Sequence, residues 1–421
     1  MYDSISEQGF SIDIRLSNLS LSAYTTLRET EWQTIQATQA EKEVAEPERE
    51  HDAELLIENI NCNDPLELYE LFVTDSIILL MVQQTNKYAM EIGTDKKHQT
   101  SWIPVSIGEM KAFLGILLIM GVVQMPDIRF YWAENSMYGN ERSMKRDRFL
   151  SILKDLHFAD NETCTLEDPL YKIRNFMKYM LSTFKNTVKL GKTVVIDESM
   201  ILWRGRLRFR RYVKGKRHKY RIKLYKLCLP NGYTYDLEVY SGKSSISSTN
   251  GHSYDVVEKL MNDLKFEEQT YFCGTVQQNR KFLPAEAKKK EKRGEILAME
   301  NSSGIKCVKW TDKRTVFMLT TCKNHKCILI EGKPGKMKPH LVFDYNNAKK
   351  GVDLSDQMAS YYNCLIVKWE KIIDRLLTTE KMSIRQIKDS NFHFVKRYIQ
   401  ALQEMFASTA GNVTENCQNP S

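Results

Sequence analysis

The sequence has 421 residues and a formal net charge of +8, with 61 lysines and arginines against 53 aspartates and glutamates. A hydrophobic share of 42% is typical of a folded protein and excludes a wholly disordered chain. Because one hydrophobic core stops growing near roughly 250–300 residues, this length allows two or three domains. We find no signal peptide and no apolar run long enough for a membrane span, so we expect a reducing compartment, the cytosol or nucleus, and no membrane partner.

Residues 1–60 contain few large apolar side chains after Leu27, and the stretch 41–58 is rich in glutamate. Such a segment buries too little apolar surface to offset the entropy lost on ordering. We therefore predict that residues 1–60 are mostly disordered.

Apolar residues at helical spacing begin after Asp64-Pro65, where aspartate precedes a proline suited to the first turn of a helix. The spacing returns over 107–123, 146–156 and 174–189. These patterns predict a helical domain over residues 61–190.

The apolar period changes to two from Thr193, and the run 193–200 predicts a buried strand that carries Asp197 near its C-terminal end. A hairpin (219–229 and 233–240), a helix (253–264) and a short strand (270–273) are predicted next. Strand, hairpin, helix and strand in this order are typical of the start of an RNase H-like sheet, so we predict the α/β class. A carboxylate at a strand end is a candidate metal ligand, which makes Asp197 the first candidate for catalysis.

Cations are concentrated between Arg204 and Lys226, where aromatic residues alternate with guanidinium groups. Several phosphate contacts from such a segment would give salt-dependent, largely non-specific affinity for nucleic acid. A solvated hairpin face is the alternative interpretation. The candidate DNA-binding residues here are Arg204, Arg208, Arg210, Arg211, Lys214, Lys216, Arg217 and Lys219.

Two clusters of residues further along the chain have more than one interpretation. The basic residues of 288–293 suit a nuclear localisation signal, a phosphate contact or a solvated loop, and we expect a nuclear protein. Cys322, His325 and Cys327 are spaced too tightly and have too few partners to predict a zinc site, so no zinc is expected.

The chain resembles the piggyBac transposases and the domesticated proteins derived from them, over roughly residues 64–369. The matching stretches occur in one order along the chain: Thr85-Asn86-Lys87-Tyr88, 113–121, Tyr131-Trp132, Asp147-Arg148-Phe149, 156–161, 196–200, Trp203-Arg204-Gly205, Gly274-Thr275-Val276, Asn279-Arg280 and 351–358.

The resemblance implies an RNase H-like catalytic core with an insertion domain, preceded by a helical dimerisation and DNA-binding domain. It also implies metal-dependent strand transfer, with Mg²⁺ or Mn²⁺ as cofactor, DNA as partner and a possible homodimer. Asp197 matches the first catalytic carboxylate and Asp353 the last, with Asp356 nearby; Asp197 and Asp353 are the expected metal ligands. Arg280 matches the loop after the sheet and joins the DNA-binding set.

The sequence departs from the family pattern after Leu264. A block of some twenty-odd residues, which in the family carries the second catalytic aspartate, is absent before 270–273. We predict that the strand 270–273 closes the gap beside the Asp197 strand, where Cys273 or Gly274 would replace the aspartate and bind no Mg²⁺.

These observations predict six segments: a disordered segment (1–60), a helical domain (61–190), a first part of the core that lacks one strand and helix (191–275), an insertion domain (276–340), the last core helix (341–365) and a helical C-terminal segment with a disordered tail (366–421). The predicted function is that of a transposase-derived DNA-binding protein unable to carry out strand transfer. The alternatives are an active metal-dependent cut-and-paste transposase and a truncated gene product without activity.

Overall fold

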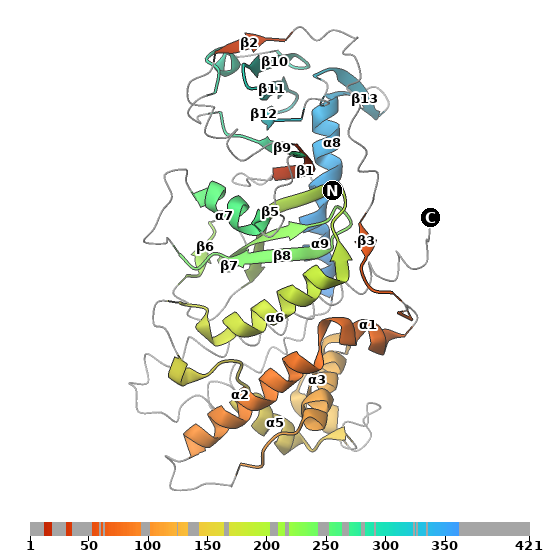
Figure 1. Cartoon of the computed structure of the whole chain (residues 1–421), viewed down its shortest axis with the longest axis vertical. Helices are drawn as coiled ribbons and strands as arrows, with labels where there is room; N and C mark the ends of the chain where they lie inside the picture. Colours follow the sequence, from red (N-terminus) through yellow and green to blue (C-terminus); the bar gives the residue numbers. More distant parts are fainter. Residues whose placement is uncertain are drawn as a thin grey trace.

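The computed structural model describes residues 12–18, 31–35 and 53–361, the last with gaps at 59, 62–63, 94–101, 124, 134–142, 164–167, 203–208, 215–218, 243–251, 263–268, 279–282, 290–291, 323–324, 326 and 334–335. The chain has a mixed α/β fold, with helices at one end of an elongated molecule and a large sheet filling the rest (Figure 1). No helix of the described ranges is long and apolar enough to cross a membrane.

The helical end confirms the helices predicted from apolar spacing. It comprises α1 (Pro65–Phe72), α2 (Asp75–Gly93), α3 (Ile107–Val122), α5 (Arg146–Asp155) and α6 (Tyr171–Thr187). The Asp64 carboxylate accepts a hydrogen bond from the Leu66 amide at the start of α1, and Ser106 and Glu109 form a capping box at the start of α3.

Ten strands form one sheet, in the order β2-β10-β11-β12-β9-β1-β5-β7-β6, with β8 also paired to β7. The strands around Asp197 are β5 (Thr193–Leu202), β6 (Arg211–Tyr212), β7 (Tyr220–Cys228) and β8 (Thr234–Val239). The helix α7 (His252–Met261) and the strand β9 (Gln269–Thr275) follow, as predicted.

Three stretches within residues 1–60, a segment predicted to be mostly disordered, form strands. β1 (Ile12–Asn18) pairs with β5 and β9, β2 (Trp32–Thr34) pairs with β10, and β3 (Glu54–Leu55) pairs with β4 (Val188–Lys189). Composition averaged over sixty residues does not reveal that apolar and polar residues alternate within Ile12–Asn18. Seven residues with this alternation are enough to form one strand.

The prediction that strand 270–273 lies beside the Asp197 strand is wrong. β1 occupies that place, antiparallel to both neighbours, with Ile12 opposite both Ile196 and Gly274. β9 therefore lies one strand further from β5. β1 can take this position because apolar and polar residues alternate along it and because it pairs with a neighbouring strand on each edge.

The region 276–340 extends the same sheet and has its own core. β10 (Ile296–Asn301), β11 (Lys306–Thr311) and β12 (Thr315–Thr320) are joined to β9 through the pairing of Met318–Thr320 with Cys273–Thr275. Ala298, Val308, Trp310 and Met318 pack together in a separate hydrophobic cluster, and the hairpin of β13 (Leu329–Lys333) and β14 (Lys336–Pro339) follows.

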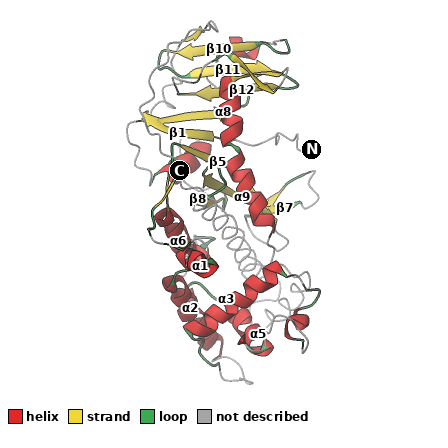
Figure 2. Ribbon diagram, turned by 90° about the vertical axis from the view of Figure 1, so that its right-hand side faces the viewer, coloured by secondary structure: helices red, strands yellow, loops and turns green. Residues whose placement is uncertain are grey.

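Two consecutive helices then lead back along the sheet. α8 (His340–Ala348) and α9 (Lys350–Tyr361) run end to end from the β13–β14 hairpin past β5 and β7 (Figures 1 and 2). Val195 and Cys228 of the sheet pack against Ala348 and Val352 of these helices. The predicted C-terminal helical segment lies outside the described residues.

The position of β1 can be tested with one proline. Ile14 pairs with Val194 on one side and Phe272 on the other, so Ile14→Pro removes a ladder hydrogen bond from a strand paired on both edges. We expect a loss of at least about 5 °C in thermal melting temperature, and faster amide hydrogen exchange in β5.

The matched control is Gln33→Pro in the edge strand β2, which is paired only with β10 among the described strands. This change should cost clearly less than Ile14→Pro. Equal melting temperatures for wild type and Ile14→Pro would contradict the pairing.

Candidate functional site

β5 carries Asp197 and lies between β1 and β7 in the sheet. The preceding residues Val194, Val195 and Ile196 are at most 3% exposed, which fixes the strand in the core. Asp197 is half-buried, and its carboxylate accepts a hydrogen bond of 2.7 Å from the Glu198 amide. In the β5–β7 ladder Asp197 stands directly opposite Lys226, so the two side chains lie on the same face of the sheet.

A glycine lets α9 approach this face. A Cβ added to Gly351 would overlap the carbonyl oxygen of Leu229 at the end of β7. Gly232, in the turn after β7, has a φ of +96°, and a Cβ added there would meet Leu354 and Met358 of α9. Close backbone contact therefore sets how near Asp353 and Asp356 come to the sheet.

Asp356 is held by the sheet. Its Oδ1 accepts hydrogen bonds from the Ser199 hydroxyl and from the Lys226 ammonium group, both at 2.7 Å. The Lys226 Nζ also donates to the Ser355 hydroxyl at 3.1 Å, and Ser355 Oγ lies 2.9 Å from Thr234 Oγ1. These contacts join β5, β7, β8 and α9 in one polar network.

Asp353 lies in the first turn of α9 and reaches solvent. Desolvation by the surrounding protein raises the pKa of the Asp353 carboxyl, and the neighbouring Asp356 carboxylate raises it further. The structure thus brings an acid from β5 and two from α9 to one side of the sheet.

The grouping of these acids bears on whether they can hold a metal ion. No group of three or more His, Cys, Asp or Glu residues within the described part of the chain is placed to hold a metal ion. Asp356 Oδ1 accepts hydrogen bonds from an ammonium group and a hydroxyl, so this oxygen is already engaged.

Lys226 belongs by sequence to the basic run that begins at Arg204, but its side chain lies inside the protein. It is only 6% exposed. The sequence contained an indication of this burial. In β7, Ile222, Leu224 and Cys228 occupy alternate positions and are buried, and Lys226 occupies a position of the same alternating set.

The rest of the basic run forms an exposed hairpin where it is described. Cations lie over aromatic rings: Arg210 is 4.1 Å from the centroid of Tyr220, Arg211 is 4.6 Å from that of Tyr240 and Lys219 is 6.0 Å from that of Tyr212. Arg211, Lys214 and Lys219 are exposed and Arg210 is half-buried. Arg204, Arg208, Lys216, Arg217 and Arg280 lie outside the described residues.

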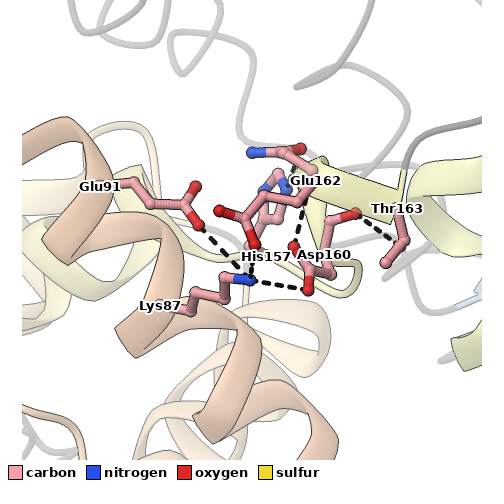
Figure 3. A network of polar contacts seen from close by, with 7 residues as sticks. Lys87, Glu91, His157, Asp160, Glu162 and Thr163 are labelled. Carbon is pink, nitrogen blue, oxygen red and sulfur yellow. Dashed lines mark hydrogen bonds and ion pairs between the residues drawn. The ribbon is translucent and has the colours of Figure 1, made fainter.

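A second polar network holds the helical end together, and it includes residues of two of the stretches that resemble the family (Figure 3). Lys87 of α2 contacts Glu91 at 3.9 Å, Asp160 at 2.7 Å and Glu162 at 2.8 Å. Hydrogen bonds to Asp160 and then Glu162 raise the pKa of Lys87.

His157 completes this contact. Its ring stacks on Tyr88 with centroids 4.1 Å apart, and burial lowers the pKa of His157 to about 4, so the ring is neutral at pH 7. The His157 backbone exchanges hydrogen bonds with the Thr85 hydroxyl. We therefore assign this network a structural role, joining α2 to the segment after α5.

Comparisons with known proteins agree with this architecture. A family model described as Transposase IS4 matches residues 64–268 and 251–380, which is most of the chain. The match defines the class as transposases, and the chain belongs to the piggyBac transposase family.

Two curated human relatives are similar to the chain. PiggyBac transposable element-derived protein 3 is 26% identical over 352 residues, covering 72% of this chain and 58% of that protein. PiggyBac transposable element-derived protein 2 is 30% identical over 156 residues, covering 36% of this chain and 25% of that protein. The chain thus spans less than two thirds of the length of either relative.

A solved structure shares the fold. It is the cryo-EM structure of a piggyBac transposase synaptic complex with hairpin DNA, which aligns with a TM-score of 0.60 and 21% identity over 85% of this chain and 82% of that chain.

The close contact at Gly351 gives a test of how the acids are positioned. Gly351→Ala places a methyl group against the Leu229 carbonyl and must push α9 outward, at a cost of roughly 1–3 kcal/mol. We expect a loss of about 3–9 °C in melting temperature. Gly115→Ala is the matched control, because an added Cβ there meets nothing within 4 Å, and this helical change should not lower stability.

Proposed function

We propose that this chain is a piggyBac transposase-derived protein that binds DNA and does not carry out strand transfer. In this proposal β5, β7, β8 and α9 belong to an RNase H-like core, residues 276–340 are an insertion in it, and residues 61–190 are a dimerisation and DNA-binding domain. The chain spans only part of its curated relatives, so their activities are not assumed for it.

The exposed hairpin carries the proposal for DNA binding. Arg210, Arg211, Lys214 and Lys219 lie together on it, and the rings of Tyr212 and Tyr220 are 55% and 40% exposed beside them. Guanidinium and ammonium groups supply phosphate contacts, and aromatic faces suit stacking on bases. The related piggyBac transposase structure was determined with hairpin DNA, which supports the same partner class here.

The acid centre supports the absence of strand transfer. Two-metal phosphoryl transfer needs several carboxylate oxygens around a pair of ions about 3.5–4 Å apart. The family's second catalytic aspartate has no counterpart in the sequence after Leu264, and one oxygen of Asp356 is engaged by Lys226 and Ser199.

One observation favours the second candidate function, an active metal-dependent transposase. β1 places Asp13 at the register position opposite Val195, two residues along β5 from Asp197. An acid from β1 in that position could take over the role of the missing aspartate. The cleavage experiment below separates the two functions.

We also propose a homodimer formed through the helical end and a nuclear location. Large apolar side chains of this region are exposed, among them Ile103 at 67% and Val122 at 69%, and contact with a second copy would remove them from water. A nuclear location follows from the proposed DNA partner and the basic residues of 288–293.

DNA binding is tested by electrophoretic shift of a duplex at a series of salt concentrations. Replacing Arg211 and Lys219 by alanine removes two exposed cations of the hairpin, so the slope of log affinity against log salt should fall by roughly two units. Lys313→Ala with Arg314→Ala removes two exposed cations between β11 and β12 and is the control, with an unchanged slope expected. No binding by the wild type at low salt would favour a gene product without activity.

Strand transfer is tested by incubating the protein with Mn²⁺ and a duplex that carries piggyBac-type ends. We expect no nicking above the level of Asp197→Ala, because the family's second catalytic aspartate has no counterpart in the sequence after Leu264. Nicking that is lost in Asp197→Ala would establish the second candidate, and its additional loss in Asp13→Asn would assign the third acid to β1.

A further inference from the structure

The side chain of Lys226 contacts one acid of the cluster, Asp356, and lies on the same face of the sheet as Asp197. Asp197 and Lys226 are a directly opposed pair, with Cβ atoms expected about 4.5–5.5 Å apart, and Ser199 lies two residues further along β5 on the same face. From this position the Lys226 Nζ reaches Asp356 Oδ1 at 2.7 Å, the oxygen that Ser199 also contacts.

The groups around Lys226 balance the charge of its ammonium group and accept its hydrogen bonds, so a second cation is not needed there. A buried ammonium is costly unless an opposite charge and hydrogen-bond acceptors are close. Lys226 has the Asp356 carboxylate and the Ser355 hydroxyl, and Ser355 is in turn fixed by Thr234, which is fully buried.

A divalent cation on Asp356 would conflict with this arrangement. Hard cations sit about 2.0–2.6 Å from carboxylate oxygens. A metal bound to Asp356 Oδ1 would therefore lie within a few ångströms of the Lys226 Nζ and would compete with it for the same lone pairs. Removing the ammonium from Asp356 would leave a positive charge unpaired inside the protein.

We propose that the Lys226 ammonium group acts as a built-in counter-ion that takes the place of a divalent metal in this cluster, so that α9 is anchored to β5 and β7 without metal. This inference deepens the inactive half of the proposed function, and it is independent of whether the hairpin binds DNA. Lys226 is here a positioning residue for Asp356.

The experiment compares melting temperatures of the full-length chain with EDTA or with excess Mn²⁺. The wild type should melt at the same temperature in both. Lys226→Met keeps the length of the side chain and removes its charge, so it should lose roughly 5–10 °C in EDTA and recover part of this loss with Mn²⁺, which then screens Asp356 and its neighbouring acids.

Lys223→Met is the matched control on the same strand. Lys223 is also ion-paired, with Glu198, and is an odd number of residues from Lys226, so it lies on the opposite face of β7. Its variant should show no response to Mn²⁺. In addition, Mn²⁺ binding measured directly by electron paramagnetic resonance should be the same for the wild type and Asp356→Asn.

A rise in the wild-type melting temperature with Mn²⁺ that disappears in Asp356→Asn would overturn the proposal. So would a Lys226→Met variant as stable in EDTA as the wild type, or one that does not respond to Mn²⁺. If Lys226→Met does not fold, the direct comparison of Mn²⁺ binding by wild type and Asp356→Asn decides alone. The DNA shift is measured separately, so failure of either proposal is recognised independently.

Discussion

An ammonium group enclosed by two strands and a helix must have its charge balanced nearby, because an unpaired charge in the interior is strongly destabilising. In this chain that constraint falls on Lys226, and Asp356 meets it across the interface between β7 and α9. The close approach that makes the contact possible depends on Gly351, where the helix backbone lies against the Leu229 carbonyl. The Lys226–Asp356 ion pair and the close contact at Gly351 together determine how near Asp353 and Asp356 of α9 lie to the sheet.

The elements with strong periodicity were predictable from the sequence, and the helices of residues 65–187 and the strands β5, β7 and β8 are where the apolar spacing placed them. Two features were not. β1 is a short alternating stretch near the start of the chain, and its partners are about 180 and 260 residues away, a distance that local pattern does not span. Lys226 belongs by charge to the basic run, and only its phase within β7 separates it from the exposed cations.

The stretches that carry the family resemblance have two different uses in the structure. Thr85–Tyr88 and the segment 156–161 meet to stabilise the helical end (Figure 3). The helix α2, which carries Thr85–Tyr88, is separated from β5 by α6 (Figure 1). Trp132 and Phe149 likewise pack in the helical core with ring centroids 5.0 Å apart. The stretch 351–358, by contrast, builds the acid centre itself. Sequence similarity alone treats these stretches alike, whereas burial and contacts separate a scaffold from a site.

The pairing of β1 has a consequence for how the protein is made. The ribosome synthesises Ile12–Asn18 first, but the two neighbours of this strand are completed only after residues 196 and 275. Until then both edges of the early strand are unpaired, and closing the sheet must bring together segments with a very large sequence separation, which is slow. During translation the sheet therefore cannot close from the N-terminus onward, and the nascent chain exposes a strand edge that other chains or a chaperone can reach.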